Sequence, residues 1–282
     1  MIEIKKLSFG YRKKEKLFTN LNLHLPPGNI FGLLGKNGAG KTTLLKIISG
    51  LLFPQGGDCE ALGYKPQCRS PHFLEEIYFI PEEFFIPAIT ISEYENIYVP
   101  FYPRFSSEQL SGSLRDFDLT MKEKLSSFSY GQKKKFLLAF GIATNCKLLI
   151  LDEPSNGLDI PSKSQLRKLL ASSITDDRTF IVSTHQVRDM ENLIDPIIIL
   201  DNGKIIFNYS VYEVSKCLSV QLQQDAPDSD KVLFSEKTLG GYAVITENIS
   251  GTDSQIDLEI LFNAVIKNRE KISSIFRKWA AA

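Results

Sequence analysis

Long hydrophobic runs are missing from this chain of 282 residues, and its formal net charge is zero. The longest apolar stretches, at 136–143 and 197–200, fall short of the roughly 18 residues that a membrane-spanning helix needs. Secretory and lipidation signals are also missing, which predicts a cytoplasmic protein that reaches any membrane through a partner chain. Because 33 basic residues balance 33 acidic ones, the charge gives no indication of nucleic-acid binding.

Cysteine is scarce as well. The four cysteines, Cys59, Cys68, Cys146 and Cys217, show no CxxC spacing and are too few for a disulfide framework. We therefore expect reduced thiols and no zinc site. Apolar residues still make up 43% of the chain, which is enough to bury one or two ordinary cores without disulfides or metals.

The order of apolar patterns predicts an α/β fold. Alternating apolar and polar residues at 2–9 and 17–25 are typical of half-buried antiparallel strands, which form an opening β-layer. Wholly apolar strands are expected at 30–34, 148–151 and 179–183. Helical spacing at 42–48 and 163–172 places helices between these strands, and this alternation favours a parallel sheet.

A mainly helical stretch interrupts this α/β pattern. We interpret a stretch of about residues 88–147 as a helical subdomain inserted into the core, with a long amphipathic helix at 132–143. The turn Asp201-Asn202-Gly203 predicts a hairpin between strands at 197–200 and 204–207. We assign residues 1–212 to one domain.

Residues 213–282 are interpreted as a small α+β appendix. The polar stretch 221–230 suggests a linker, and short strands are expected at 231–234 and 242–246. Apolar spacing across 258–279 predicts a closing amphipathic helix that covers this small sheet.

A glycine-rich loop joins the strand at 30–34 to the helix at 42–48. Its residues, Gly35, Lys36, Asn37, Gly38, Ala39, Gly40, Lys41 and Thr42, fit the pattern GxxxxGK[ST]. Glycines let backbone N–H groups approach phosphate oxygens, and the helix N-terminus adds positive potential. We expect Lys41 to reach the β- and γ-phosphates of a nucleotide, Thr42 to bind Mg²⁺, and Thr43 to belong to the same nucleotide site.

Two adjacent carboxylates end the apolar strand at 148–151. Alternation along a strand points Asp152 and Glu153 in different directions, so one can hold a metal while the other acts on water. We expect Asp152 to bind Mg²⁺ through a coordinated water and Glu153 to polarise the attacking water. His185 follows the strand at 179–183, at the edge where open α/β sheets bind ligands, and is interpreted as a sensor of the γ-phosphate.

In this order the residues resemble the ATP-binding subunits of ABC transporters, over about residues 1–210. His185 resembles the switch histidine of that family, and the stretch 155–159 resembles its D-loop. The signature pentapeptide is matched by Phe128, Ser129, Tyr130, Gly131 and Gln132. Tyr11 stands where the family has an aromatic residue that stacks on adenine, and Glu82 stands where it usually has Gln.

The resemblance implies an ATPase with an α/β P-loop NTPase core. It implies that Tyr11 stacks on the adenine of ATP and that Glu82 joins Thr42 and Asp152 near Mg²⁺. The helix end formed by Ser129, Tyr130, Gly131 and Gln132 is a second anion-binding end, and the resemblance implies that it caps ATP held by another chain. Asp159 is expected to contact nucleotide across the same interface.

Two such chains, identical or different, would close on two ATP molecules and open after hydrolysis. This cycle would drive a separate transmembrane permease docked on the helical subdomain near Glu82. The short subdomain and the appendix resemble those of exporters, so we expect a peripheral protein on the inner face of the membrane. The aromatic stretch 84–89 could contact the permease or form an ordinary core.

Departures from the family pattern leave alternatives open. Tyr130 replaces a glycine and Phe128 a leucine in the signature, Glu82 replaces Gln, and Gly157 replaces an alanine of the D-loop. The altered signature leaves room for an ATP-binding regulatory module with weak hydrolysis. A soluble ABC protein acting on nucleic acid or translation is the other alternative, although the single motif set argues against it. The run at 133–135 is interpreted as a solvated helix face.

Overall fold

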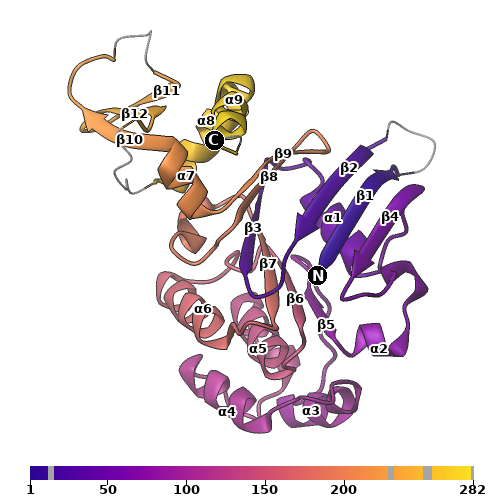
Figure 1. The fold of residues 1–282 in the computed structure, drawn as a ribbon. Helices are drawn as coiled ribbons and strands as arrows, with labels where there is room; N and C mark the ends of the chain where they lie inside the picture. The colour runs from indigo at the N-terminus through magenta and orange to yellow at the C-terminus, as the bar shows by residue number, and fades with distance from the viewer. Residues whose placement is uncertain (12–15, 228–231, 250–255, 281–282) are drawn as a thin grey trace.

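The structure, a computed structural model, describes residues 1–11, 16–227, 232–249 and 256–280, and these residues form three sheets flanked by helices (Figure 1). The central sheet has six strands in the order β5-β6-β7-β3-β8-β9. These strands are β3 (Ile30–Leu34), β5 (Ile77–Ile80), β6 (Leu148–Asp152), β7 (Thr179–Thr184), β8 (Ile197–Asp201) and β9 (Lys204–Tyr209). All but β9 run parallel, as the alternation of strands and helices predicts.

The register of the parallel strands places the functional loops together. Asp152 at the end of β6 pairs with Ser183 of β7, and Leu34 at the end of β3 pairs with Thr184. The carboxyl ends of β3, β6 and β7 therefore meet at one edge, from which the glycine-rich loop, Glu153 and His185 continue.

A second sheet packs beside the central one. It is antiparallel, in the order β2-β1-β4, with β1 (Ile2–Phe9), β2 (Phe18–Leu25) and β4 (Gly56–Ala61). The two opening strands are thus confirmed, whereas β4 and β5 lie in a stretch for which the sequence pattern predicted no element.

Helices cover both faces of the central sheet. In the first part of the chain they are α1 (Lys41–Ile48), α2 (Pro71–Leu74), α3 (Ile91–Tyr98), α4 (Ser107–Asp116), α5 (Tyr130–Ala143) and α6 (Ile160–Ser173). Single 3₁₀ turns lie at η1 (Pro66–Cys68), η2 (Val99–Phe101), η3 (Leu125–Ser127) and η4 (Val187–Met190). Figure 1 shows α3 and α4 at the end of the molecule farthest from the C-terminal sheet.

Alternate residues of the central strands face two separate cores. Leu149 and Leu151 of β6 belong to the core that includes α5 and α6, while Leu148 and Ile150 belong to the core formed with α1 and the antiparallel sheet. The expected amphipathic character of 132–143 is wrong for its second half, because every residue from Phe136 to Ala143 is buried. This half of α5 lies between the sheet and the α3–α4 layer.

The described part of the C-terminal region contains a third sheet, in the order β10-β12-β11, and three helices. They are α7 (Val211–Cys217), β10 (Leu218–Gln223), β11 (Phe234–Thr238), β12 (Gly241–Glu247), α8 (Leu258–Lys267) and α9 (Arg269–Ala280). The hairpin predicted at Asp201-Asn202-Gly203 is confirmed by β8 and β9. Both Asn202 and Gly203 have positive φ, as a two-residue hairpin turn requires.

Three predictions for this region are wrong in detail. Residues 221–223 belong to β10 and not to a linker, the strand expected at 231–234 begins only at Phe234, and Lys231 lies outside the described residues. The single closing helix is two helices that meet at Asn268. Phe276 of α9 packs on Tyr209 of β9, at 4.2 Å between ring centroids, whereas α8 packs on β11 and β12 of the small sheet.

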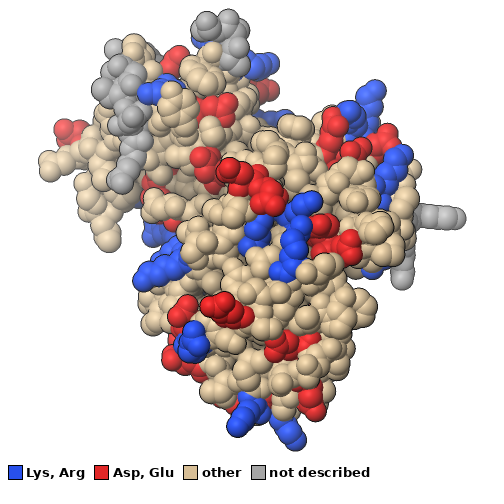
Figure 2. Space-filling model, turned by 60° about the horizontal axis from the view of Figure 1, so that its bottom comes forward, with Lys and Arg blue, Asp and Glu red and all other residues tan. Residues whose placement is uncertain are grey.

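Among the described residues, every helix is too short or too polar to cross a membrane. On the face that Figure 2 shows, basic and acidic side chains are interspersed, as the balanced composition suggests.

Candidate active site

A cavity of about 650 Å³ lies at the carboxyl edge of the central sheet. The glycine-rich loop lines one wall, and Tyr11, Glu82 and Glu153 line the others. Four segments far apart in sequence therefore meet at the edge to which the parallel register brings the strand ends.

Close contacts and backbone conformation in the glycine-rich loop require the residue types found there. Gly40 has a φ of 109°, and a Cβ there would lie 2.9 Å from the Phe18 ring, so a side chain would be both strained and crowded. Lys41 follows as the first residue of α1 and is buried. Its Nζ donates to the carbonyl of Gly35 at 2.7 Å and lies 3.6 Å from Oε1 of Glu153.

Thr42 and Asp152 form the part of the site that can take a magnesium ion. The Thr42 hydroxyl donates to Oδ2 of Asp152 at 2.7 Å, and the Ser183 hydroxyl donates to Oδ1 of the same carboxylate. Magnesium usually binds one or two protein oxygens and keeps several waters and phosphate oxygens as its other ligands. A hydroxyl and a carboxylate within hydrogen-bond distance, beside a phosphate loop, fit that donor set.

Glu153 lies between two basic side chains. Its Oε1 is 2.9 Å from Nδ1 of His185 and faces Lys41, while its Oε2 accepts from the backbone N–H of His185 at 3.3 Å. The Glu153 N–H donates to Ser183, at 3.1 Å from both the carbonyl and the hydroxyl oxygen. The structure therefore brings Lys41, Glu153 and His185 into one cluster, as the predicted roles of these residues require.

Tyr11 presents its ring to the cavity. The residue is 52% exposed. Its ring packs edge-on against Phe9 at 5.1 Å, and its hydroxyl lies 3.0 Å from Oγ1 of Thr43. A phenol held at its tip, with much of its ring open to solvent, is suited to stacking on a flat base.

The signature-like residues form the N-terminus of α5. Ser129 is the N-cap: its Oγ accepts from the Gln132 N–H at 3.2 Å, and Oε1 of Gln132 accepts from the Ser129 N–H at 2.9 Å. In this capping box the side chains of Ser129 and Gln132 both bind backbone groups of their own chain. Asp159 is used in a similar way, because it caps α6 by accepting from the Ser162 N–H, and these bonds lower its pKa.

Three of the four departures from the family pattern, Glu82, Tyr130 and Gly157, lie in one cluster. The Tyr130 hydroxyl donates to the carbonyl of Glu82 at 2.6 Å, and its ring stacks on Phe84 at 5.1 Å. Asn156 donates to Oε1 of Glu82 at 3.0 Å. A Cβ on Gly157 would lie 2.7 Å from the Tyr130 ring, so the larger residue at 130 and the smaller one at 157 compensate each other.

Comparisons with known proteins agree with this arrangement. A family model described as ABC transporter matches residues 18–156. The chain is 33% identical over 214 residues to the lantibiotic transport ATP-binding protein SrtF of Streptococcus pyogenes, in a match that covers 73% of this chain and 89% of that protein. The chain belongs to the ABC transporter family.

Solved structures of other ABC ATPases share the fold of this chain. An ATP-binding subunit of an ABC transporter has a TM-score of 0.69 and 26% identity, covering 76% of this chain and 91% of that one. An ATP-binding cassette solved as a post-hydrolysis dimer with ADP and Pi has a TM-score of 0.66 and 24% identity, covering 74% and 98%. The predicted α/β P-loop NTPase fold, the binding of ATP and the ATPase activity are thereby confirmed.

The lysine run after the signature is not the solvated face that we expected. Lys134 is buried, and its Nζ donates to the backbone carbonyl of Glu153 at 2.5 Å. Burial lowers the pKa of Lys134 to about 8, although the nearby carboxylates of Glu82, Glu153 and Asp152 act in the opposite direction. The expectation failed because α5 is enclosed on this side by the loop that follows β6.

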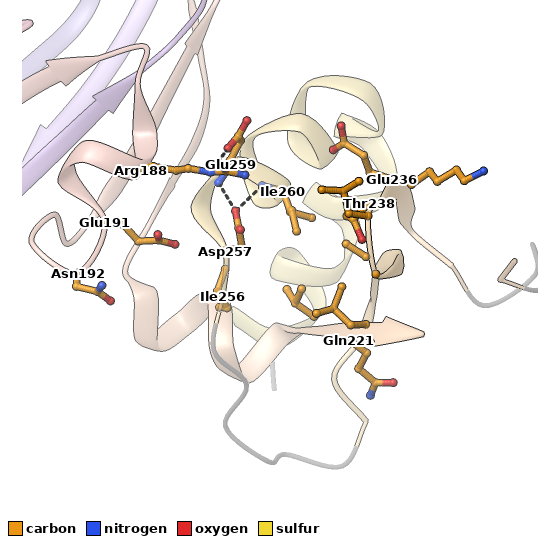
Figure 3. Close-up of a pocket in the computed structure, with 16 residues that line it drawn as sticks. Arg188, Glu191, Asn192, Gln221, Glu236, Thr238, Ile256, Asp257, Glu259 and Ile260 are labelled. Atoms are coloured by element: carbon orange, nitrogen blue, oxygen red, sulfur yellow. Dashed lines mark hydrogen bonds and ion pairs between the residues drawn. The ribbon is translucent and has the colours of Figure 1, made fainter. Parts of the chain in front are cut away.

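A larger cavity lies away from the phosphate loop. It measures about 1230 Å³ and lies between the small C-terminal sheet, α8 and η4 (Figure 3). In its wall Arg188 of η4 pairs with Glu259 of α8 at 2.5 Å, and Asp257 caps α8. Because its residues belong to none of the catalytic motifs, we place the active site at the smaller cavity.

The appendix also approaches the nucleotide site itself. Phe262 of α8 lines a cavity of about 230 Å³ together with Gly35 and His185. The helix of the appendix therefore packs beside the loop that carries the switch-like histidine, a contact that the sequence pattern did not predict.

Sequence reasoning missed Ser183 and Lys134 in this site, and it placed Asn156 in the D-loop stretch without its bond to Glu82. A signal for Ser183 was available, since it ends an apolar strand expected to neighbour Asp152. For Lys134 there was none, because it reaches the site through a contact between a helix and a loop that no periodicity predicts.

Proposed function

We propose that this ABC ATPase is the motor of an exporter whose membrane-spanning chain is separate. The observation that carries the proposal is the convergence of Lys41, Thr42 and Glu153 on one cavity. Asp152 is bound to Thr42 and His185 to Glu153 directly beside it. The transport role named for the SrtF relative supports it, as does the likeness of the short helical subdomain and appendix to those of exporters.

Thr42 and Asp152 are the residues that would hold Mg²⁺ in this site. When bound there, the ion would neutralise charge on the β- and γ-phosphates of ATP. Ser183 donates to the other oxygen of the Asp152 carboxylate, which fixes the carboxylate beside Thr42. Glu82 already binds Asn156 through one oxygen and keeps the other for water or metal.

Lys41 and Glu153 exchange partners when ATP enters. In the structure, the Lys41 ammonium is held by the Gly35 carbonyl and faces the Glu153 carboxylate. A triphosphate in the loop offers Lys41 stronger anionic acceptors, which releases Glu153 to accept a proton from the attacking water. His185, already beside Glu153, orients that carboxylate and can donate a hydrogen bond to the γ-phosphate.

The N-terminus of α5 would complete the site of a second chain. Ser129 and Gln132 satisfy each other, so the contacts offered to a nucleotide are the helix dipole and the exposed N–H groups of the first turn. Gly131 brings this turn against the D-loop, since a Cβ at 131 would lie 2.8 Å from the Gly157 carbonyl oxygen. Two copies, or this chain and a similar one, would thus sandwich two ATP molecules.

The surface after Glu82 is proposed as the contact for the permease. Phe84, Ile86 and Ile89 pack against the core, whereas Phe85 is 90% exposed and is the residue that we propose contacts the permease. An apolar ring presented beside the loop of Glu82 would couple membrane-chain movement to the nucleotide site. Through that partner the subunit would lie on the inner face of the membrane.

The sandwich is tested by the Glu153→Gln variant with Mg²⁺ and ATP. The variant lacks the base for hydrolysis but keeps the phosphate loop, so we expect a stable dimer by light scattering after size exclusion. Adding Lys41→Ala to the same variant removes the phosphate contact and should leave a monomer. A Glu153→Gln protein that stays monomeric with saturating ATP at high protein concentration would contradict the proposal.

A further inference from the structure

Lys134 is a buried cation without a carboxylate bound directly to it. It has no exposed surface, and its one hydrogen bond given by the structure is to the main-chain oxygen of Glu153. Its Nζ also lies 5.7 Å from the centroid of the Tyr130 ring, one helical turn earlier. Burying an ammonium is unfavourable unless its contacts compensate, so a purely structural position would be better filled by an apolar side chain.

The acceptor of this bond is a residue in an unusual conformation. Glu153 has a φ of 48°, in the left-handed region that non-glycine residues rarely adopt. Its N–H donates to Ser183, and its carbonyl accepts from Lys134 and, at 3.2 Å, from the N–H of Asn156, so both of its backbone groups are fixed by neighbours. This conformation turns the chain after β6 and directs the Glu153 carboxylate to Lys41 and His185.

Lys134 also connects two parts of the proposed catalytic cycle. It belongs to α5, whose first turn would meet the nucleotide of a partner chain, and it holds the residue that would activate water in its own site. Tyr130 on the same helix face is anchored to the carbonyl of Glu82. The first turns of α5 are thus joined to the loops on both sides of the cavity.

We propose that Lys134 is a positioning residue for ATP hydrolysis, which holds the backbone of Glu153 in its left-handed conformation and ties it to the signature end of α5. The proposal rests on the proposed function, because it assigns the role of Lys134 through Glu153. Lys134 does not touch nucleotide, so its removal should affect the chemical step and not the binding of ATP.

The test compares Lys134→Met and Lys134→Gln with the unmodified chain. Methionine fills the volume without a donor, and glutamine keeps an N–H donor on a shorter side chain. Since small displacements of a catalytic group reduce rates strongly, we expect kcat to fall by roughly 10- to 100-fold in Lys134→Met, with KM for ATP changed by less than about twofold. The kcat of Lys134→Gln should be intermediate. As a control, Lys168→Met, on the exposed face of α6, should leave kcat unchanged.

A second readout separates positioning from folding. In the Glu153→Gln background, Lys134→Met should still form the ATP-dependent dimer and should unfold at a denaturant concentration no lower than the parent. A kcat within twofold of the unmodified chain would overturn the proposal, as would loss of dimer formation together with kcat. If the unmodified chain does not hydrolyse ATP and the Glu153→Gln variant does not dimerise, the proposed function fails, and the role of Lys134 fails with it.

Discussion

The phosphate-loop end of the proposed site is held in place by contacts within the chain, whereas the signature end is more open to solvent. At the first, Lys41, Asp152 and Glu153 are buried and each is held by a partner from another strand or loop. At the second, Tyr130 is 45% exposed and the first turn of α5 faces solvent. One half is preorganised within the chain, whereas the other offers a helix end to a molecule that is bound elsewhere.

The two ends are nevertheless joined inside the chain. Lys134 links α5 to Glu153, and Tyr130 links it to the Glu82 loop. Substitutions at the two ends should therefore differ in which step they affect, and the following experiments order these effects from the largest to the smallest.

Removing the phosphate contact should have the largest effect. Lys41→Ala deletes the buried cation of the loop, and loss of one such charge-stabilising group reduces kcat by roughly 10²- to 10³-fold in other enzymes. Turnover of saturating ATP by the purified variant checks this. Turnover equal to that of the unmodified chain would exclude the phosphate-loop assignment.

A change at the signature end should affect stability through one steric contact. Gly157→Ala places a methyl group against the Tyr130 ring at a positive φ, for which we expect a loss of about 1–3 kcal/mol in the free energy of unfolding. Urea titration measures it. The loss should be smaller in a Tyr130→Ala background, and strictly additive losses would show that the two residues are not coupled.

The adenine contact should be intermediate in size. Tyr11→Ala removes an exposed ring that we expect to stack on the base, which weakens ATP binding by about 1–3 kcal/mol. Fluorescent nucleotide titration gives this value, and Tyr11→Phe is the control because it keeps the ring while losing the Thr43 contact. Equal affinity in Tyr11→Ala and the unmodified chain would place the base elsewhere.

The smallest effect is expected in the appendix. Arg188 and Glu259 form an ion pair with well-exposed side chains, and such pairs contribute between zero and about 1 kcal/mol. Arg188→Ala should therefore change the unfolding free energy and kcat little. A large fall in kcat at unchanged stability would instead show that α8 controls the neighbouring His185 loop.

The phosphate loop and the strand ends could be predicted because their signals are local. A glycine pattern between an apolar strand and a helix defines the loop, and two acids after an apolar strand define their edge of the sheet. The Asn202-Gly203 hairpin is local in the same sense, since both residues favour positive φ.

What could not be predicted depends on contacts between distant segments. In the sequence Lys134 belongs to a charged run, and only its contact with the loop after β6 shows that it is buried. Gly157 in place of alanine is a neutral change in the sequence, and only the nearby Tyr130 ring shows why glycine is needed there. The break between α8 and α9 was missed because apolar spacing continues through Asn268. In each case the deciding contact joins residues that no sequence period connects.

Specific ATPase activity as a function of protein concentration tests the composite site most directly. With Glu153→Gln as the blank, the activity per chain should rise with concentration and level off as the dimer becomes saturated, and the blank should be at least roughly 10²-fold lower. Activity per chain that is constant across concentrations where light scattering shows only monomer would contradict a site shared between two chains.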